Sequence, residues 1–145
     1  GAATFQSLSG RPVGQGMFDA PEQWEMAHLS FAERADVLLI APCSANTLAK
    51  LAHGLADDLL SCAALATKAP VVIAPAMNAN MWLHPATRAN VTLLRSRGVV
   101  IVEVGEGELA CGARGPGRLA EADRILAAVA RALGQRTPGR ARRRG

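Results

Sequence analysis

Hydrophobic residues form three short runs that predict strands. The runs Val37–Ala41, Val71–Ala74 and Val99–Val104 are almost wholly apolar and rich in Val and Ile. Each run is too short for a buried helix, and strands that are covered on both faces show this continuous apolar pattern. We therefore expect three strands of a sheet that is buried on both sides.

The segments between these runs show helical spacing. From Ser44 onward one long helix is predicted by apolar residues at i, i+3, i+4 and i+7, namely Leu48, Leu51, Ala52, Leu55, Leu59 and Ala63. A second helix is expected over Pro85–Arg97, stopped by Gly98, and a third over Glu121–Leu133, ending at Gly134. This alternation predicts an α/β fold, Rossmann-like or flavodoxin-like, with a parallel sheet and helices on both faces.

The two ends of the chain differ from its middle. The stretch Gly1–Gly16 contains no strand pattern and no glycine-rich phosphate loop, so we expect the fold to lack its first βα unit. A length of 145 residues fits one domain, which we place at residues 1–135. Residues 136–145 are expected to form a basic tail or linker.

Composition excludes several classes of protein. Half of the residues are hydrophobic and 19% are charged, which excludes a disordered chain. The net charge of +4 is a property of five arginines near the end, Arg136, Arg140, Arg142, Arg143 and Arg144. The rest of the chain has a net charge of −1, so we expect no nucleic-acid partner. Only the arginines of the tail would favour a nucleic-acid-binding function. No leader and no spanning apolar run is visible, so we expect no membrane association.

The cysteines predict a reducing compartment. Cys43, Cys62 and Cys111 are an odd number at wide spacing, with neither a CxxC pair nor a zinc pattern. A disulfide framework is therefore not expected, and the chain is predicted to be cytoplasmic and to hold no metal.

Two of the predicted strands end in polar turns, where α/β sheets bind ligands. After the first strand, Ser44 is placed to cap a helix with Asn46 and Thr47 in its first turn, where free N–H groups would face a ligand. The alternative is that Ser44 only caps the helix. After the second strand, Asn78 is placed either to bind a carboxylate or carbonyl through its amide, or simply to form a turn.

The stretch Gly105–Arg118 contains five glycines and is predicted to be an unusually long loop. Cys111, with Arg114 and Arg118 near it, is either an accessible, partly activated thiol in a mobile lid or an incidental cysteine in a surface loop.

Other polar residues favour structural roles. We expect a packing or surface role for His53 within the long helix, a turn-capping role for His84, and a solvated or interface corner of that helix for Asp57 and Asp58. Spacing alone gives His28 no more than a structural role.

Three segments match motifs of one family. Ala41–Lys50, continued by Gly54–Leu60, resembles the flavin-proximal motif of the flavin-containing cysteine decarboxylases. Pro75–Asn78 with Met81–Trp82 resembles the substrate-binding motif of that family. A third set of residues resembles the substrate clamp of that family, namely Leu109, Ala110, Cys111, Gly112, Gly115, Gly117 and Arg118.

A fourth segment, His28–Leu29 followed by Ala35–Asp36, matches the position of the catalytic histidine in this family. The motifs occur in the order of the family between Ala27 and Glu121. The branch that they resemble most decarboxylates phosphopantothenoylcysteine to phosphopantetheine in coenzyme A biosynthesis. In bacteria this domain is often fused to a ligase.

The resemblance implies a flavin mechanism. FMN would take a hydride from the cysteine moiety, after which carbon dioxide is lost. His28 would act as acid and base, and Cys111 would donate a proton as the hydride returns to the product. Substrate would be bound by Asn78, Met81, Ala110 and Gly112. The FMN site would be lined by Ser44, Ala45, Asn46, Thr47 and Ala76. Thr4 and Phe5, whose match to the family is weaker, would also contact the flavin.

The family also implies an assembly and two alternatives. Its members form homotrimers or larger homo-oligomers with flavin at the subunit contacts, and we expect the same here. A peptidyl-cysteine decarboxylase is the near alternative, which Cys111 disfavours. A non-catalytic flavin-fold binding or regulatory protein is the other, which the joint presence of His28, Asn78 and Cys111 disfavours.

Overall fold

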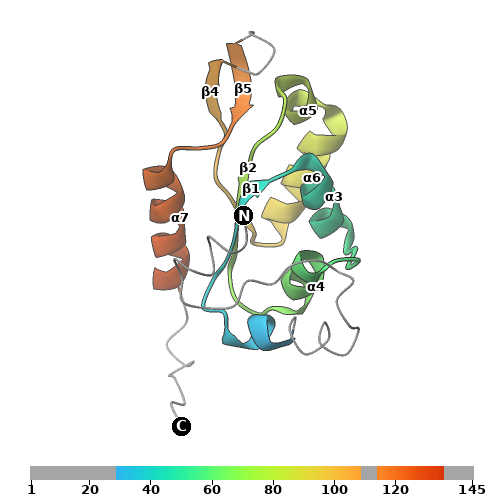
Figure 1. Cartoon of the computed structure of the whole chain (residues 1–145), viewed down its shortest axis with the longest axis vertical. Helices are drawn as coiled ribbons and strands as arrows, with labels where there is room; N and C mark the ends of the chain where they lie inside the picture. The colour runs from blue at the N-terminus through green and yellow to red at the C-terminus, as the bar shows by residue number, and fades with distance from the viewer. Residues whose placement is uncertain (1–28, 109–113, 136–145) are drawn as a thin grey trace, which may run out of the picture.

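A parallel sheet of three strands forms the centre of the molecule (Figure 1). The computed structural model of the chain describes residues 29–108 and 114–135. Strands β1 (Leu38–Cys43), β2 (Val71–Pro75) and β3 (Val100–Ile101) lie side by side in this order, and both pairs are parallel. The three predicted strands are confirmed, although the third is only two residues long.

The end of β1 is irregular. Ile40 lies opposite Ile73, but Cys43 lies opposite Pro75, so that two residues of β1 stand against one of β2. Pro42 lies in this bulge. Proline has no backbone N–H group to donate, and a bulge leaves its extra residue out of the hydrogen-bonded ladder, so proline is tolerated there.

Helices cover both faces of the sheet, as predicted. Helices α3 (Ala45–His53) and α6 (Pro85–Ser96) cover one face, and α7 (Ala122–Gly134) covers the other (Figure 1). Adjacent residues of β2 pack on opposite faces of the sheet, because side chains alternate along a strand. Ile73 packs with α3 and α6, whereas Val72 packs with α7.

The prediction of one long helix after Ser44 is wrong. Helix α3 ends at Gly54, whose φ of 69° is left-handed, and a separate helix α4 (Leu59–Ala66) follows. Glycine adopts this conformation without steric cost and is the common residue at such helix ends. The apolar spacing continues through Leu55, but that side chain is 56% exposed and does not extend the buried face of α3.

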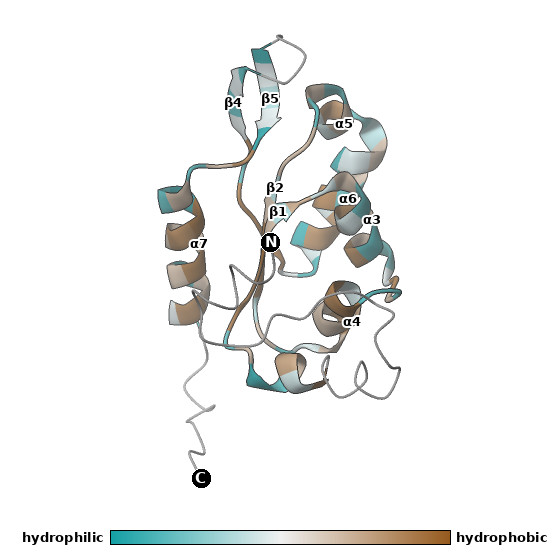
Figure 2. Cartoon of the chain, in the orientation of Figure 1, coloured by the Kyte–Doolittle hydropathy of each residue, from teal (hydrophilic) through white to brown (hydrophobic). Residues whose placement is uncertain are grey.

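The prediction of a long loop over Gly105–Arg118 is also wrong for the residues that the structure describes. Strands β4 (Gly105–Glu108) and β5 (Arg114–Arg118) form an antiparallel hairpin. Their sequences, GEGE and RGPGR, contain residue types that are depleted in strands, so propensity could not reveal them. Figure 2 shows the hairpin in white and teal, in contrast to the brown central strands.

The remaining helices agree with the sequence, with one addition. The second predicted helix is α6 and the third is α7, and Gly98 follows α6 with a φ of 86°. The short helix α5 (Ala79–Leu83) was not predicted. Residues 29–34 are helical as well. No helix in residues 29–108 and 114–135 has the length and apolar character needed to cross a membrane.

Candidate functional site

The two polar turns meet at the carboxyl ends of β1 and β2. The backbone N–H of Ala76 donates to the carbonyl oxygen of Cys43 at 3.1 Å, which joins the segment after β2 to the end of β1. The carboxyl ends of parallel strands share one edge of the sheet, where open α/β folds bind ligands. The structure thus brings together the residues predicted after both strands.

Ser44 caps α3, as the sequence predicted. Its Oγ accepts a hydrogen bond from the N–H of Thr47 at 3.1 Å and lies 3.2 Å from Thr47 Oγ1. Its carbonyl oxygen accepts from the N–H of Leu48 at 2.9 Å. Ser44 therefore caps the helix, as expected, and its side chain accepts from one of the N–H groups that a helix start leaves without an intrahelical acceptor.

The N–H groups of Ala45 and Asn46, the first two residues of α3, have no acceptor within the described residues. Asn46 is exposed, and the first turn of α3 carries no acidic residue that would repel an anion. An α-helix start concentrates positive potential on such groups. This set of neutral donors suits a phosphate group or the polar edge of a flavin ring.

Cys43 forms the buried floor beneath this turn. Its side chain is fully buried, and its thiol lies 3.5 Å from the carbonyl oxygen of Ser44. Burial raises the pKa of Cys43 to about 12, because an apolar environment disfavours the thiolate. Cys43 is therefore a packing residue and not a reactive thiol at neutral pH.

Asn78 caps α5 in the second turn. Its Oδ1 accepts from the N–H of Asn80 at 2.8 Å, and its carbonyl oxygen accepts from the N–H of Trp82 at 3.0 Å. Trp82 is buried in the core, so the turn is held firmly. Since Oδ1 is occupied by the cap, the Asn78 amide group keeps its NH₂ donors for a ligand.

The β4–β5 hairpin lies beside this second turn. Met77 donates its N–H to the carbonyl oxygen of Gly117 on β5 at 2.8 Å. Figure 1 shows the hairpin and α5 at the same end of the molecule. Met81 on α5 is 47% exposed and offers an apolar surface near the polar turn. Sequence reasoning missed the Gly117 contact, because no motif signals which glycine touches a distant backbone.

Several predicted site residues lie outside the residues that the structure describes. Six of the predicted site residues belong to this group: Thr4, Phe5, His28, Ala110, Cys111 and Gly112. The basic tail, residues 136–145, and the expectation about a first βα unit fall outside them as well. Ser44, Ala45, Asn46, Thr47, Ala76, Asn78 and Met81 are described, and all of them lie at or next to the two polar turns.

The other histidines have structural partners. His84 caps α6, with its Nδ1 accepting from the N–H of Ala86 at 3.0 Å, which confirms the predicted capping role. His53 Nε2 lies 3.0 Å from Asn90 Oδ1 and links α3 to α6. In the described part of the chain, no group of three or more His, Cys, Asp or Glu side chains is arranged to hold a metal ion.

Asp57 and Asp58 do not form a corner of one long helix, because the helix is interrupted there. Asp58 starts α4 with a reciprocal capping box, in which its Oδ1 accepts from the N–H of Ser61 at 2.7 Å. Lys50 pairs with Asp57 at 2.9 Å and with Asp58 at 3.1 Å. The carboxylates of Asp57 and Asp58 raise the pKa of Lys50 by hydrogen bonding to its ammonium group.

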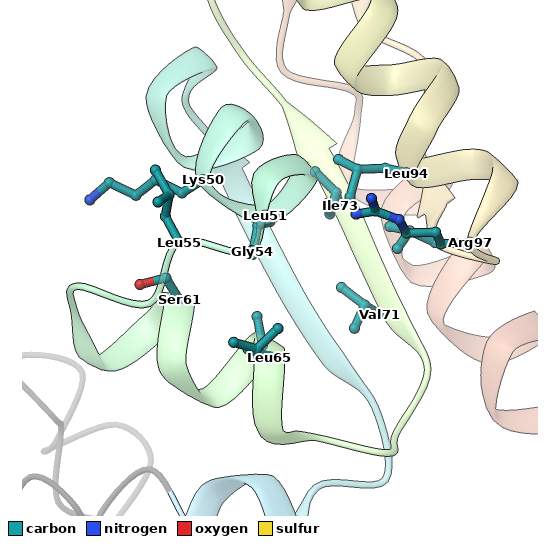
Figure 3. Close-up of a pocket in the computed structure, with 12 residues that line it drawn as sticks. Lys50, Leu51, Gly54, Leu55, Ser61, Leu65, Val71, Ile73, Leu94 and Arg97 are labelled. Carbon is teal, nitrogen blue, oxygen red and sulfur yellow. The ribbon is translucent and has the colours of Figure 1, made fainter.

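A cavity of about 180 Å³ lies elsewhere, among α3, α4 and α6 (Figure 3). Its walls include Leu51, Leu65, Val71 and Leu94. In Figure 3 the Lys50 ammonium group points away from the centre of the cavity. Val71 begins β2, so the cavity is at the amino end of that strand, away from the two polar turns. It is apolar and shares no residue with them.

Comparison with known proteins assigns the chain to a family. The family model described as Flavoprotein matches residues 3–134, which is nearly the whole chain. This chain belongs to the flavoprotein family. Its relatives place it among the flavin-containing cysteine decarboxylases, as the motifs predicted, and their structures confirm the flavodoxin-like α/β fold.

Two curated relatives illustrate the similarity. The coenzyme A biosynthesis bifunctional protein CoaBC of Mycolicibacterium smegmatis is 48% identical over 125 residues, covering 86% of this chain and 30% of that protein. CoaBC of Bacillus subtilis is 44% identical over 123 residues, covering 85% of this chain and 30% of that protein. The chain therefore spans about 30% of the length of these relatives.

Two solved structures share the fold. The FMN-dependent cysteine decarboxylase SpaF is 40% identical, with a TM-score of 0.73, and the match covers 93% of this chain and 71% of SpaF. A cysteine-to-serine mutant of PPC decarboxylase, complexed with pantothenoylaminoethenethiol, is 36% identical with a TM-score of 0.67. That match covers 83% of this chain and 64% of the other.

Proposed function

We propose that this chain is the FMN-dependent decarboxylase part of a coenzyme A biosynthesis protein and converts phosphopantothenoylcysteine to phosphopantetheine. The observation that carries the proposal is the juxtaposition of two polar turns at one sheet edge. One turn offers N–H donors that have no acceptor among the described residues, and the other offers an amide for a carboxylate. The identity of 48% to CoaBC supports the choice of substrate.

The first turn fits FMN. Its neutral donors are the backbone N–H groups of Ala45 and Asn46, the Asn46 amide and the Thr47 hydroxyl. Ala76 lies beside them through its bond to Cys43. A bound FMN would supply the electron acceptor for oxidation of the cysteine moiety. The residues of this turn would hold and orient it, and Ser44 would keep the helix start in place.

The second turn would bind the substrate. The Asn78 NH₂ group would donate to the carboxylate that is lost, because Oδ1 is already engaged with Asn80. Met81 would contact apolar parts of the substrate. We assign Ala110 and Gly112 to substrate binding, and Thr4 and Phe5 to FMN, on the resemblance of their motifs.

Two further roles rest on the resemblance. His28 would move protons as acid and base, and Cys111 would donate the proton that completes the saturated product. A PPC decarboxylase carrying serine for cysteine is complexed with an ethenethiol, which supports a role for a cysteine after carbon dioxide loss. We expect C111S to release carbon dioxide and accumulate the unsaturated thiol without the saturated thiol product, phosphopantetheine.

The wider context is part of the proposal. We infer that residues 1–135 form the decarboxylase domain and residues 136–145 a basic tail or linker. We also infer that a ligase domain accompanies the decarboxylase domain, and that the chain works as a homotrimer or larger homo-oligomer in the cytoplasm. The word bifunctional in the names of the CoaBC relatives supports a second catalytic unit.

A spectrum and a substrate pair test the function. The purified protein, reconstituted with FMN where needed, should show flavin absorbance and release carbon dioxide from phosphopantothenoylcysteine. A peptide with a carboxyl-terminal cysteine serves as the second substrate, because SpaF is also a close structural match. If the protein decarboxylates the peptide but not phosphopantothenoylcysteine, the proposed substrate is wrong. If the protein binds no FMN, the proposal as a whole is refuted.

A further inference from the structure

Gly117 occupies a bulge in the β4–β5 hairpin. Gly105 pairs with Arg118 and Glu106 pairs with Pro116, so Gly117 stands without a partner on β4. The extra residue of a bulge is left out of the ladder, which frees its carbonyl group for another donor. That donor is the N–H of Met77, at 2.8 Å. The hairpin is thus attached to the turn after β2 through backbone atoms.

This attachment requires glycine for two reasons. Gly117 has a φ of 129°, a region that residues with a side chain rarely adopt. A Cβ at this position would overlap the carbonyl oxygen of Met77 and lie 3.3 Å from its carbonyl carbon and 3.4 Å from the nitrogen of Ala79. Gly117 is also buried, so the added atom has no solvent side to move toward.

The attachment bears directly on Asn78. Met77 precedes Asn78, and Ala79 follows it. Gly117 bonds the backbone of Met77, and the space that its missing Cβ leaves open borders the backbone nitrogen of Ala79. On its other side the turn is fixed by the α5 cap, through the Asn80 and Trp82 N–H groups. The Asn78 amide therefore projects from a backbone that is held by two independent elements.

We infer that Gly117 is a positioning residue that sets the Asn78 amide for recognition of the substrate carboxylate. This inference rests on the proposed function, and it deepens it by giving Gly117 a role that is exerted through the backbone next to Asn78. The glycine acts by allowing the close backbone approach, and the hydrogen bond to Met77 fixes the distance between the hairpin and the turn.

Carboxylate discrimination tests the inference in the FMN-loaded protein. We expect G117A to bind phosphopantothenoylcysteine at least about tenfold more weakly, the cost of one lost hydrogen bond to a charged group. Binding of phosphopantetheine, which lacks the carboxylate, should be unchanged. The matched control is G105A in the same hairpin, whose Cβ would meet ordinary contacts at 3.6 Å and 3.7 Å.

A double-mutant cycle separates positioning from general damage. In the N78A background, G117A should cause little further loss of carboxylate discrimination, because the group that it positions is already absent. Equal loss for both ligands, or full additivity with N78A, would overturn the inference.

Hydrogen exchange keeps the test independent of the proposed function. The Met77 amide should exchange faster in G117A than in the parent protein and G105A, while the Val72 amide in the sheet stays protected. If G117A fails to fold, an ester linkage in place of the 76–77 amide removes the same donor without adding an atom. Unchanged Met77 exchange in G117A refutes the attachment, whereas absence of turnover in the parent protein refutes only the proposed function.

Discussion

The two ends of the sheet differ in how their polar groups are satisfied. At the amino end of β2, Lys50 is neutralised by Asp57 and Asp58, and Arg97 donates to the carbonyl oxygen of Ala52 at 2.7 Å. Lys50 and Arg97 line a mostly apolar cavity, and both have protein partners. At the carboxyl end, Asn46 and the NH₂ of Asn78 face solvent.

This difference locates the site better than the shape of the surface does. A polar ligand gains most where protein donors have no internal partner, because no internal hydrogen bond is lost on binding. The cavity is a hollow of about 180 Å³, but its polar groups are already engaged. Substitutions at the amino end should therefore change stability, and substitutions at the carboxyl end should change binding.

The largest expected effect concerns Cys43, at the base of the carboxyl-end turn. We expect native Cys43 to react with iodoacetamide at pH 8 about a thousandfold more slowly than in the urea-unfolded chain. The reason is that its pKa rises from 9.0 to about 12, and the thiolate is the reactive form. Time-resolved mass spectrometry of the Cys43 peptide measures both rates. A native rate within tenfold of the unfolded rate would contradict the buried position of this thiol.

Ile73 connects the two ends, and its truncation should affect both. It is fully buried, packs in the same cluster as Cys43 and also lines the cavity. We expect I73A to lower the free energy of unfolding by about 2–5 kcal/mol, the usual cost of such a truncation in a core. Urea denaturation measures this change. L126A on α7, where the side chain is 65% exposed, is the control and should change stability by less than about 0.5 kcal/mol.

Asn46 separates binding from stability. We expect N46A to weaken FMN binding by about tenfold, which corresponds to one hydrogen bond, with no change in the urea midpoint. S44A should weaken binding and also lower stability by about 1 kcal/mol, because Ser44 caps α3. Flavin fluorescence titration measures the affinities. L65A, at the exposed rim of the cavity, should leave FMN affinity unchanged. Weaker FMN binding by L65A would contradict the assignment of binding to the carboxyl end alone.

Much of the carboxyl end could be predicted from the sequence, because its signals are local. The caps at Ser44 and His84 depend on residues within three positions along the chain. The continuous apolar runs indicate which strands are buried on both faces. The same local logic placed Ser44 and Asn78 at strand ends, which the parallel topology then brings together.

The failures have two different physical origins. Gly54 and Asp58 are residue types that end and begin helices, but the apolar spacing continues across them and predicted a single helix. The β4–β5 hairpin is stabilised by backbone pairing and by the attachment of Gly117 to Met77, and neither leaves a pattern in the residues of the hairpin. Residue types alone therefore predicted a loop.

The smallest expected effect is the pH dependence of Asp58 at the amino end. Partial burial acts to raise the pKa of Asp58, but hydrogen bonds from Ser61 and Lys50 outweigh it, so the pKa lies below its ordinary value of 3.8. A carboxyl with a lowered folded-state pKa stabilises the fold fully above its unfolded value and loses this contribution as pH falls through the folded-state pKa. D58N should retain the cap, because asparagine is an equally good cap residue, but lose the charge.

We therefore expect D58N to be less stable than the parent protein at pH 7 by no more than about 1 kcal/mol, as for other partly exposed pairs, and equally stable near pH 2. Urea denaturation at a series of pH values between 7 and 2 measures the two curves. D57N is the matched variant, and its effect should be smaller because Asp57 is 60% exposed and caps no helix. A gap between the parent and D58N that widens toward acid would reverse the sign and exclude the ionised Asp58 as the stabilising form. An accompanying change in FMN affinity would show that the two ends of the sheet are coupled, since Asp58 lies at the end where no ligand is expected.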